Sequence, residues 1–120
     1  MSTADLEDTG PFPAPQTDVH AVLTLDRIVH EPARLAILAV LQSAAEVDFA
    51  FLLLATGLSK GNLSKQTSKL EEAGYITIRK YHKGRIPATA YRITPDGSAA
   101  FAAYWERMTS IGQSVQRPDP

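Results

Sequence analysis

Several features are missing from this sequence of 120 residues. It contains no cysteine, which excludes disulfide bonds, thiolate metal ligands and thiol-based redox sensing, and which favours a cytoplasmic location. No apolar run reaches about 18 residues, so we expect no membrane-spanning helix and no membrane partner. The first residues carry acids instead of the basic segment that opens a signal peptide. The length and the 44% share of hydrophobic residues fit one globular domain.

Charge is balanced in total but segregated along the chain. Lysine and arginine number 12 against 13 aspartates and glutamates, a total that gives no reason to expect a nucleic-acid partner. Residues 1–20, however, carry four acidic and no basic side chains, whereas residues 59–92 carry eight basic and two acidic ones. The basic stretch is either an ordinary solvated surface or a surface for an anionic partner, and its secondary structure decides between them.

Apolar residues in the first half of the chain recur at helical spacing. This spacing predicts a short helix that ends at His30 and a second helix over about 32–43, for which Pro32 is a suitable first residue. A third helix is predicted from Asp48, as its N-cap, to Gly57.

The next helix follows after a very short link. Ser59 is a suitable N-cap for a helix over 59–73, which Gly74 closes. Only residues 57–59 connect it to the helix before. Because so short a turn forces the two helices to cross steeply, the pair is predicted to form a helix-turn-helix.

Beyond this helix the apolar period changes to about two. Residues 75–80 and 88–93 are predicted strands, joined by a hairpin loop over 81–87 with Gly84 near its tip. Thr94, followed by proline and aspartate, is a strong start signal for a last helix. The predicted fold is mainly α with a small β-hairpin (α+β): a winged helix-turn-helix with a C-terminal helix.

These elements divide the chain into four segments. Residues 1–16 are rich in proline and acids and are predicted to be a disordered arm. Residues 17–93 form the predicted winged-helix domain, and 94–116 form the C-terminal helix. A flexible tail is expected over 117–120.

The helix over 59–73 has one apolar and one polar face. Leu63 and Leu70 mark the face predicted to pack on the core, with Gln66 and Thr67 at its borders. The polar side combines short hydroxyls, an amide, a glycine and lysines, which suit base edges and phosphates in a DNA groove better than they suit a merely solubilising surface. The predicted DNA-binding residues of this helix are Lys60, Gly61, Asn62, Ser64, Lys65, Ser68 and Lys69.

The hairpin is also basic, with few acids nearby in the sequence. Basic side chains on a loop beside a recognition helix suit the sugar-phosphate backbone or an adjacent minor groove. The predicted DNA-binding residues of the hairpin are Arg79, Lys80, His82, Lys83 and Arg85.

The last helix carries a long apolar stripe that allows two interpretations. The stripe either folds back onto its own domain or forms a surface for self-association, and its size favours a homodimer. A two-fold dimer would present paired recognition helices to a palindromic operator. The predicted interface residues are Phe101, Tyr104, Trp105, Met108, Ile111 and Val115.

Several segments resemble the compact winged-helix regulators of the MarR and ArsR groups. The resemblance rests on residues 25–38, on Leu-Ser-Lys-Gly-Asn-Leu-Ser-Lys at 58–65, on Leu-Glu-Glu-Ala-Gly-Tyr at 70–75 and on Tyr-Arg-Ile-Thr-Pro-Asp-Gly at 91–97. It implies a dimeric transcriptional regulator that places helix 59–73 in the major groove of double-stranded DNA and uses hairpin 79–87 as the wing.

Other functions have less support. The sequence has no nucleophile elbow, phosphate loop or HExxH motif, so we expect no enzyme and no cofactor. His20, His30 and His82 are too scattered to suggest a metal site. A small-molecule effector is compatible with the fold, but no polar anchor indicates one. The main alternative is a winged helix that contacts proteins without binding DNA.

Overall fold

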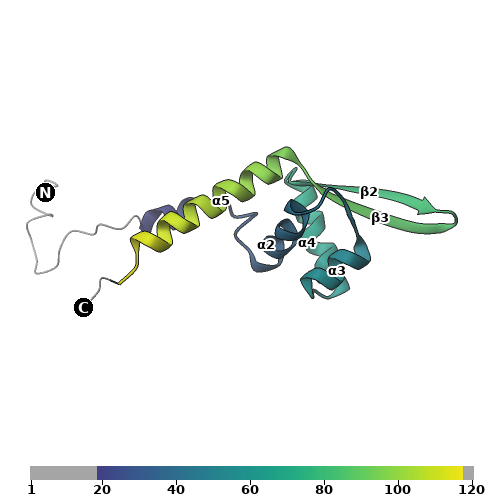
Figure 1. Ribbon diagram of the computed structural model, residues 1–120, viewed down its shortest axis with the longest axis horizontal. Helices are drawn as coiled ribbons and strands as arrows, with labels where there is room; N and C mark the ends of the chain where they lie inside the picture. The colour runs from purple at the N-terminus through teal and green to yellow at the C-terminus, as the bar shows by residue number, and fades with distance from the viewer. Residues whose placement is uncertain (1–18, 118–120) are drawn as a thin grey trace, which may run out of the picture.

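The computed structural model describes residues 19–117 (Figure 1). The predicted arm over 1–16 and residues 118–120 of the predicted tail lie outside this range. The elements follow one another as η1 (Val19–Thr24), α2 (Pro32–Gln42), β1 (Val47–Asp48), α3 (Phe49–Thr56), α4 (Lys60–Glu72), β2 (Ile76–Lys83), β3 (Ile86–Ile93) and α5 (Pro95–Ser114).

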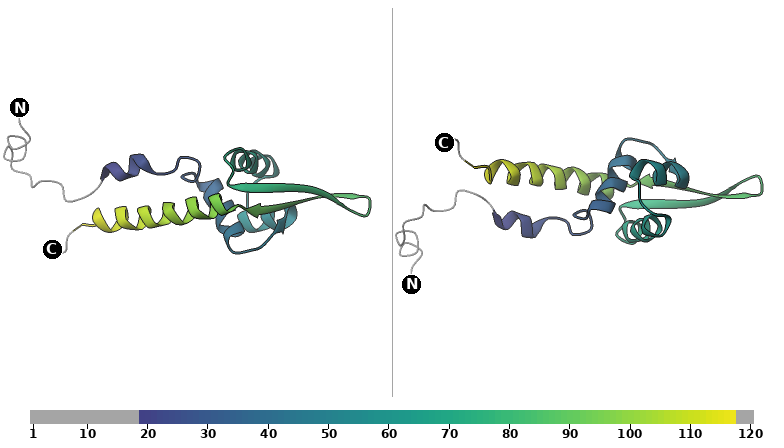
Figure 2. Two further views of the ribbon diagram at one scale, coloured as in Figure 1. Left: turned by 90° about the horizontal axis from the view of Figure 1, so that it is seen from above. Right: turned by 90° about the horizontal axis from the view of Figure 1, so that it is seen from below.

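Helices α2, α3 and α4 form the body of the domain. The β2–β3 hairpin extends from one side of this body, and α5 extends from the other side with η1 along its C-terminal half (Figures 1 and 2). This order and arrangement are those of the predicted winged helix-turn-helix.

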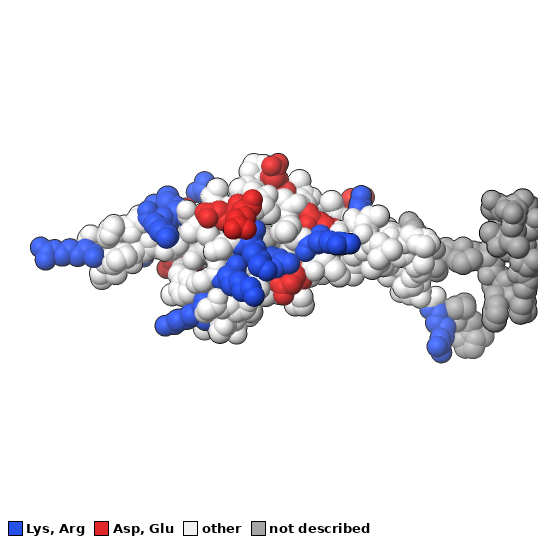
Figure 3. Space-filling view, turned by 180° about the vertical axis from the view of Figure 1, so that it is seen from behind, with Lys and Arg blue, Asp and Glu red and all other residues white. Residues whose placement is uncertain are grey.

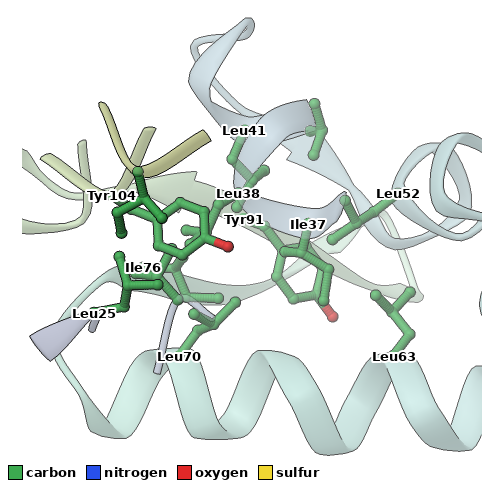
Figure 4. Close-up of a cluster of buried hydrophobic side chains, with 13 residues drawn as sticks. Leu25, Ile37, Leu38, Leu41, Leu52, Leu63, Leu70, Ile76, Tyr91 and Tyr104 are labelled. Atoms are coloured by element: carbon green, nitrogen blue, oxygen red, sulfur yellow. The ribbon is translucent and has the colours of Figure 1, made fainter. Parts of the chain in front are cut away.

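A single apolar core holds the body together. Leu63 and Leu70 point into it from α4, and Ile37 and Leu38 from α2, with Leu52 of α3 alongside (Figure 4). Each of these five side chains is completely buried. Burial of each is worth about 1.5–3 kcal/mol, so the core fixes which face of α4 remains outside.

The helix-turn-helix forms as its capping residues predict. Asp48 accepts a hydrogen bond from the amide of Phe51 at 2.8 Å at the start of α3. Gly57 then ends α3 with a φ of 70°, a left-handed conformation that glycine adopts without strain. Ser59 caps α4, so the short link between the helices is the one expected.

The start of the described chain differs from its prediction. In place of an α-helix that ends at His30, the structure has the 3-10 helix η1 up to Thr24 and then a turn. Oδ1 of Asp26 accepts hydrogen bonds from the amides of Ile28 at 2.8 Å and Val29 at 3.2 Å. Because aspartate offers the backbone this alternative to helical hydrogen bonds, the helix does not continue through residue 26.

The sheet is larger than predicted. The strands run to Lys83 and from Ile86, so only Gly84 and Arg85 turn the chain where a loop over 81–87 was expected. The added residues pair in register up to Lys83 and Ile86. Strand β1, which the sequence analysis missed because it is two residues long, pairs with β3 and gives the order β1-β3-β2.

Candidate nucleic-acid interface

Helix α4 presents its polar face to solvent. Leu63, Gln66, Thr67 and Leu70 are buried, and Thr67 satisfies its hydroxyl by donating to the carbonyl oxygen of Leu63 at 2.9 Å. The polar residues predicted on the opposite side are all exposed except Asn62, which is half-buried. These exposed residues are Lys60, Gly61, Ser64, Lys65, Ser68 and Lys69.

A chain of polar contacts reaches Asn62 from the domain interior. Nη1 of Arg34 donates to Oε1 of Gln66 at 2.7 Å, and Nε2 of Gln66 donates to Oδ1 of Asn62 at 3.0 Å. Arg34 and Gln66 were not among the predicted functional residues. The one available signal was a basic residue, Arg34, within an otherwise apolar helix.

Glu31 holds Arg34 in place from the start of α2. Its carboxylate caps the helix by accepting from the amides of Ala33 at 3.1 Å and Arg34 at 2.9 Å. It also lies 3.9 Å from Nη1 of Arg34. Nε of Arg34 donates to the carbonyl oxygen of Ile28 at 2.5 Å, so the guanidinium is fixed by α2 and by the turn before it.

The hairpin carries exposed basic residues out to its turn. Lys80, His82 and Lys83 lie on β2, and Arg85 lies in the turn beside Gly84. A φ of 63° at Gly84 permits the tight turn. The two-residue connection places Lys83 and Arg85 at the far end of a paired ribbon, whereas a flexible loop was expected.

Arg79 differs from the other predicted hairpin residues because it has an acidic partner. Its Nη2 lies 2.9 Å from Oε1 of Glu46, and its guanidinium stacks 4.4 Å from the ring centroid of Tyr81. The hydrogen bond from Arg79 lowers the pKa of Glu46 and raises that of Arg79. The sequence around the hairpin does not reveal this partner, because folding brings Glu46 from 33 positions away to the base of the hairpin.

A cleft of about 570 Å³ lies between α4 and the sheet. Ser64 and Ser68 line it from the helix, and Lys80 and Thr89 line it from the hairpin. Tyr91 forms part of its inner wall, and burial raises the pKa of this phenol. The exposed face of α4 and the inner half of the hairpin therefore border one common groove.

Basic side chains extend over one face of the molecule. Figure 3 shows lysine and arginine from the far end of the hairpin to the body of the domain, with acidic groups between them. The acids of α4 itself are Glu71 and Glu72, in its last turn. The first two turns of α4 therefore carry only basic charge.

The predicted dimer residues of α5 fall into two groups. Tyr104 and Ile111 are buried in the domain's own core, and Phe101 and Met108 are partly buried against it. Within one protomer, these four residues therefore pack on their own domain, which was the alternative to a dimer interface. Trp105 and Val115 remain 47% and 48% exposed.

Further exposed apolar side chains lie next to α5. They belong to η1, which packs along α5, where Nη1 of Arg107 donates to the carbonyl oxygen of Thr24 at 3.0 Å. We call these exposed apolar residues, together with Trp105 and Val115 of α5, the η1–α5 surface. Its members from η1 are Val19, Val22 and Leu23.

The described residues form a second cleft but no metal-ligand cluster. Between residues 19 and 117, no three histidine, aspartate or glutamate side chains come together as metal ligands. A cleft of about 790 Å³ between η1 and α5 is lined by polar groups that include His20, Glu106 and Arg107, which are far apart in the sequence. No helix in this range is long and apolar enough to span a membrane.

Comparisons with known proteins agree with this architecture. A family model described as a winged helix DNA-binding domain matches residues 33–111. An uncharacterized protein of Methanocaldococcus jannaschii is 31% identical over 91 residues, which cover 75% of this chain and 98% of that protein.

Solved structures share the fold at lower identity. A transcriptional regulator homologue from Pyrococcus horikoshii OT3 superposes with a TM-score of 0.76 at 21% identity, covering 82% of this chain and all of that one. A MarR-family regulator described as putative, from Enterococcus faecalis V583, gives a TM-score of 0.61 at 18% identity, covering 86% of this chain and 98% of the other. The protein belongs to the winged helix DNA-binding domain family, and it shares its fold with MarR-family transcriptional regulators.

Proposed function

We propose that this protein is a transcriptional regulator that binds double-stranded DNA in a sequence-specific manner. One observation carries the proposal: the polar, basic face of α4 is exposed, while the opposite face is fixed in the core. Solubility alone does not require that three lysines, two serines and a glycine share the exposed side of one helix. Helix-turn-helix proteins read base edges with such a helix.

Helix and hairpin take different roles in this proposal. The exposed serines, Asn62 and Lys65 read base edges in the major groove, because hydroxyl, amide and ammonium groups match the donors and acceptors found there. The hairpin contacts the backbone or the adjacent minor groove through Lys80, Lys83 and Arg85. Its length carries these charges away from the body of the domain (Figure 1).

We further propose that the regulator is a homodimer. The η1–α5 surface contains Leu23, which is 73% exposed, and the single tryptophan, Trp105. Large apolar side chains left exposed on two neighbouring elements favour association. A two-fold axis through it would set two recognition helices about 34 Å apart, one turn of duplex, and would match a palindromic operator.

A fluorescence anisotropy titration tests DNA binding. We expect the full chain to bind duplex DNA at about 50 mM salt, and its affinity to fall steeply with added salt because several phosphates are neutralised in each dimer. A selection of bound sequences from a random duplex pool would then identify the preferred site. The proposal would be refuted if the protein bound neither mixed-sequence duplex nor selected duplex at this salt concentration.

A protein-contact module is the second candidate. It is favoured by the outer face of α3, where Leu54 is 84% and Phe51 is 53% exposed. Apolar side chains at these positions suit a protein partner. This candidate predicts that the chain lacks affinity for duplex DNA, which the anisotropy titration measures directly. It also predicts that Leu54→Ser abolishes capture of a protein partner.

A further inference from the structure

We propose that Arg34 and Gln66 orient the side-chain amide of Asn62, so that Asn62 presents hydrogen-bond donors to DNA and selects guanine over adenine. This inference rests on the proposed DNA-binding function and adds a rule for specificity at one base. Arg34 and Gln66 act as positioning residues, since both lie behind the surface of α4 that faces DNA.

The orientation begins at Arg34 because a guanidinium has donors and no acceptor. The group that meets Nη1 of Arg34 at 2.7 Å must therefore be the oxygen of Gln66. Gln66 is 8% exposed and cannot turn its amide toward water. Its nitrogen consequently faces the other way, toward α4's first turn.

The same reasoning fixes Asn62. Nε2 of Gln66 is a donor, and it meets Oδ1 of Asn62 at 3.0 Å. The Asn62 oxygen is thus directed inward, and its Nδ2 is left with two N–H groups. Among residues 19–117, Nδ2 has no hydrogen-bond partner.

Asn62 occupies a position from which these donors can reach a base. It is the third residue of α4. Its backbone N–H donates to Oγ of the N-cap Ser59 at 3.1 Å, and this hydrogen bond holds the first turn in place. In helix-turn-helix proteins the N-terminal residues of the recognition helix contact base edges.

The chemistry of the major groove converts this orientation into a preference. An asparagine that reads adenine needs its oxygen for N6 and its nitrogen for N7. Here the oxygen is directed inward toward Gln66, and the nitrogen alone faces outward, where its two N–H groups match the O6 and N7 acceptors of guanine. One net hydrogen bond corresponds to about a fivefold preference for guanine over adenine.

Base selection by variants of the full chain tests the inference. Random duplex pools are enriched with the wild type and with Asn62→Ala, and the position where Asn62→Ala removes a preference is the base read by Asn62. We expect the wild type to favour guanine there by about fivefold. A wild-type preference for adenine at this position would overturn the inference.

Gln66→Glu is the decisive variant. The new carboxylate still accepts from Arg34 but cannot donate, so the Asn62 amide should rotate, turn its nitrogen inward and present its oxygen to DNA. We expect the preference at that one position to change to adenine or cytosine, which offer an amino donor. Unchanged preference with Gln66→Glu would contradict the proposal.

Two further variants separate positioning from structural damage. Arg34→Lys keeps a donor-only cation against Gln66 and should retain guanine. Gln66→Met, which removes both hydrogen bonds without a new charge, should lose the preference at the same position, and it replaces Gln66→Glu if that variant does not fold.

The remaining outcomes are equally distinct. An Asn62→Ala variant that weakens binding to all sequences alike would place Asn62 on a phosphate and overturn the inference, while leaving DNA binding intact. Failure of the wild type to bind any duplex would instead refute the proposed function itself.

Discussion

The carbonyl oxygen of Tyr75 lies so close to Gly97 that a Cβ at residue 97 would come within 2.0 Å of it. The amide of Thr94 donates to the same oxygen at 3.0 Å, and Oγ1 of Thr94 donates to the carbonyl oxygen of Gly74 at 2.6 Å. Since Gly74 and Tyr75 lie just beyond Ala73, the C-cap of α4, the start of α5 packs on the turn that ends the proposed recognition helix. The two helices are thus connected through backbone atoms, which cannot move aside as a side chain can.

Replacement of Gly97 by alanine should therefore destabilise the fold. The added methyl group would overlap Tyr75 and force α5 away from α4, at a cost of about 3 kcal/mol in the free energy of unfolding. Chemical denaturation followed by circular dichroism measures this change.

Gly112→Ala is the matched control in the same helix. A Cβ at Gly112 would meet nothing within 4 Å, and alanine is a better helix former than glycine by about 1 kcal/mol. We expect this variant to be at least as stable as the wild type. Equal destabilisation by both substitutions would mean that the contact with Tyr75 is unimportant.

The side chain of Tyr75 makes a second connection, to the turn before α2. Its hydroxyl donates to Oδ2 of Asp26, whose other oxygen holds the backbone of that turn. Hydrogen bonds to a charged acceptor contribute about 1.5–3 kcal/mol. Tyr75→Phe should lower the free energy of unfolding at pH 8 by an amount in this range, measured by urea denaturation.

The contribution of Tyr75 should also depend on pH. The hydrogen bond to Asp26 raises the pKa of Tyr75 to about 12, from an ordinary value of 10.0. Because the neutral phenol is favoured in the folded state, the stabilisation is complete below pH 10 and is lost as pH rises toward 12. The difference between wild type and Tyr75→Phe should be smaller at pH 11 than at pH 8, and a constant difference would contradict this account.

The architecture could be predicted because its signals are local. Asp48, Ser59 and Thr94 are N-caps, and each accepts the expected backbone hydrogen bond. The errors arose where tertiary contacts decide the outcome. Strand β1 exists because Val47 and Asp48 pair with β3, and Asp26 stops a helix that its apolar neighbours would allow.

The candidate site was predictable to a similar extent. Helical periodicity separates the buried and exposed faces of α4, so the exposed serines and lysines could be named from the sequence. Partners that are distant in sequence could not. Neither the pairing of Arg79 with Glu46 nor the contact of Gln66 with Arg34 follows from spacing, because each joins residues more than 30 positions apart.

Separate variants of the helix and of the hairpin should affect DNA binding in different ways. Ser64→Ala with Lys65→Ala should reduce the ratio of affinities for selected and unselected duplexes, because these side chains are proposed to read bases. Lys83→Ala with Arg85→Ala should weaken both affinities alike and reduce the salt slope by about 1.8 for each protomer, about 3.6 for the dimer, because two phosphate contacts are lost in each protomer. The reverse pattern, in anisotropy titrations over a range of salt, would exchange the proposed roles.

Glu46→Gln should strengthen DNA binding by freeing Arg79. Because its pKa is lowered, Glu46 stays ionised at neutral pH. Its negative charge therefore offsets the positive charge of Arg79 under ordinary binding conditions. Release of Arg79 to one phosphate in each protomer should make the salt slope steeper by about 0.9 for each protomer, about 1.8 for the dimer. Glu106→Gln, on the exposed side of α5, removes an equal charge away from the hairpin and should leave the slope unchanged. Equal slopes for all three proteins would show that Arg79 does not contact DNA.

Leu23→Glu should convert the proposed dimer into a monomer. A carboxylate without a partner is costly inside an apolar interface, and Leu23 is among the most exposed residues of the η1–α5 surface. Sedimentation velocity distinguishes monomer from dimer by the sedimentation coefficient. Leu54→Glu is the matched control, because Leu54 is equally apolar and even more exposed but lies on α3, and this variant should sediment as the wild type does.

Loss of the dimer should also change DNA binding in a specific way. Two linked half-sites gain about a hundredfold or more in affinity over a single one through effective concentration. The Leu23→Glu monomer should therefore lose this factor on a palindromic duplex and keep wild-type affinity for an isolated half-site, since α4 and the hairpin are untouched. A Leu23→Glu protein that still sediments as a dimer would place the interface elsewhere, and a monomeric wild type would remove the reason for a palindromic operator.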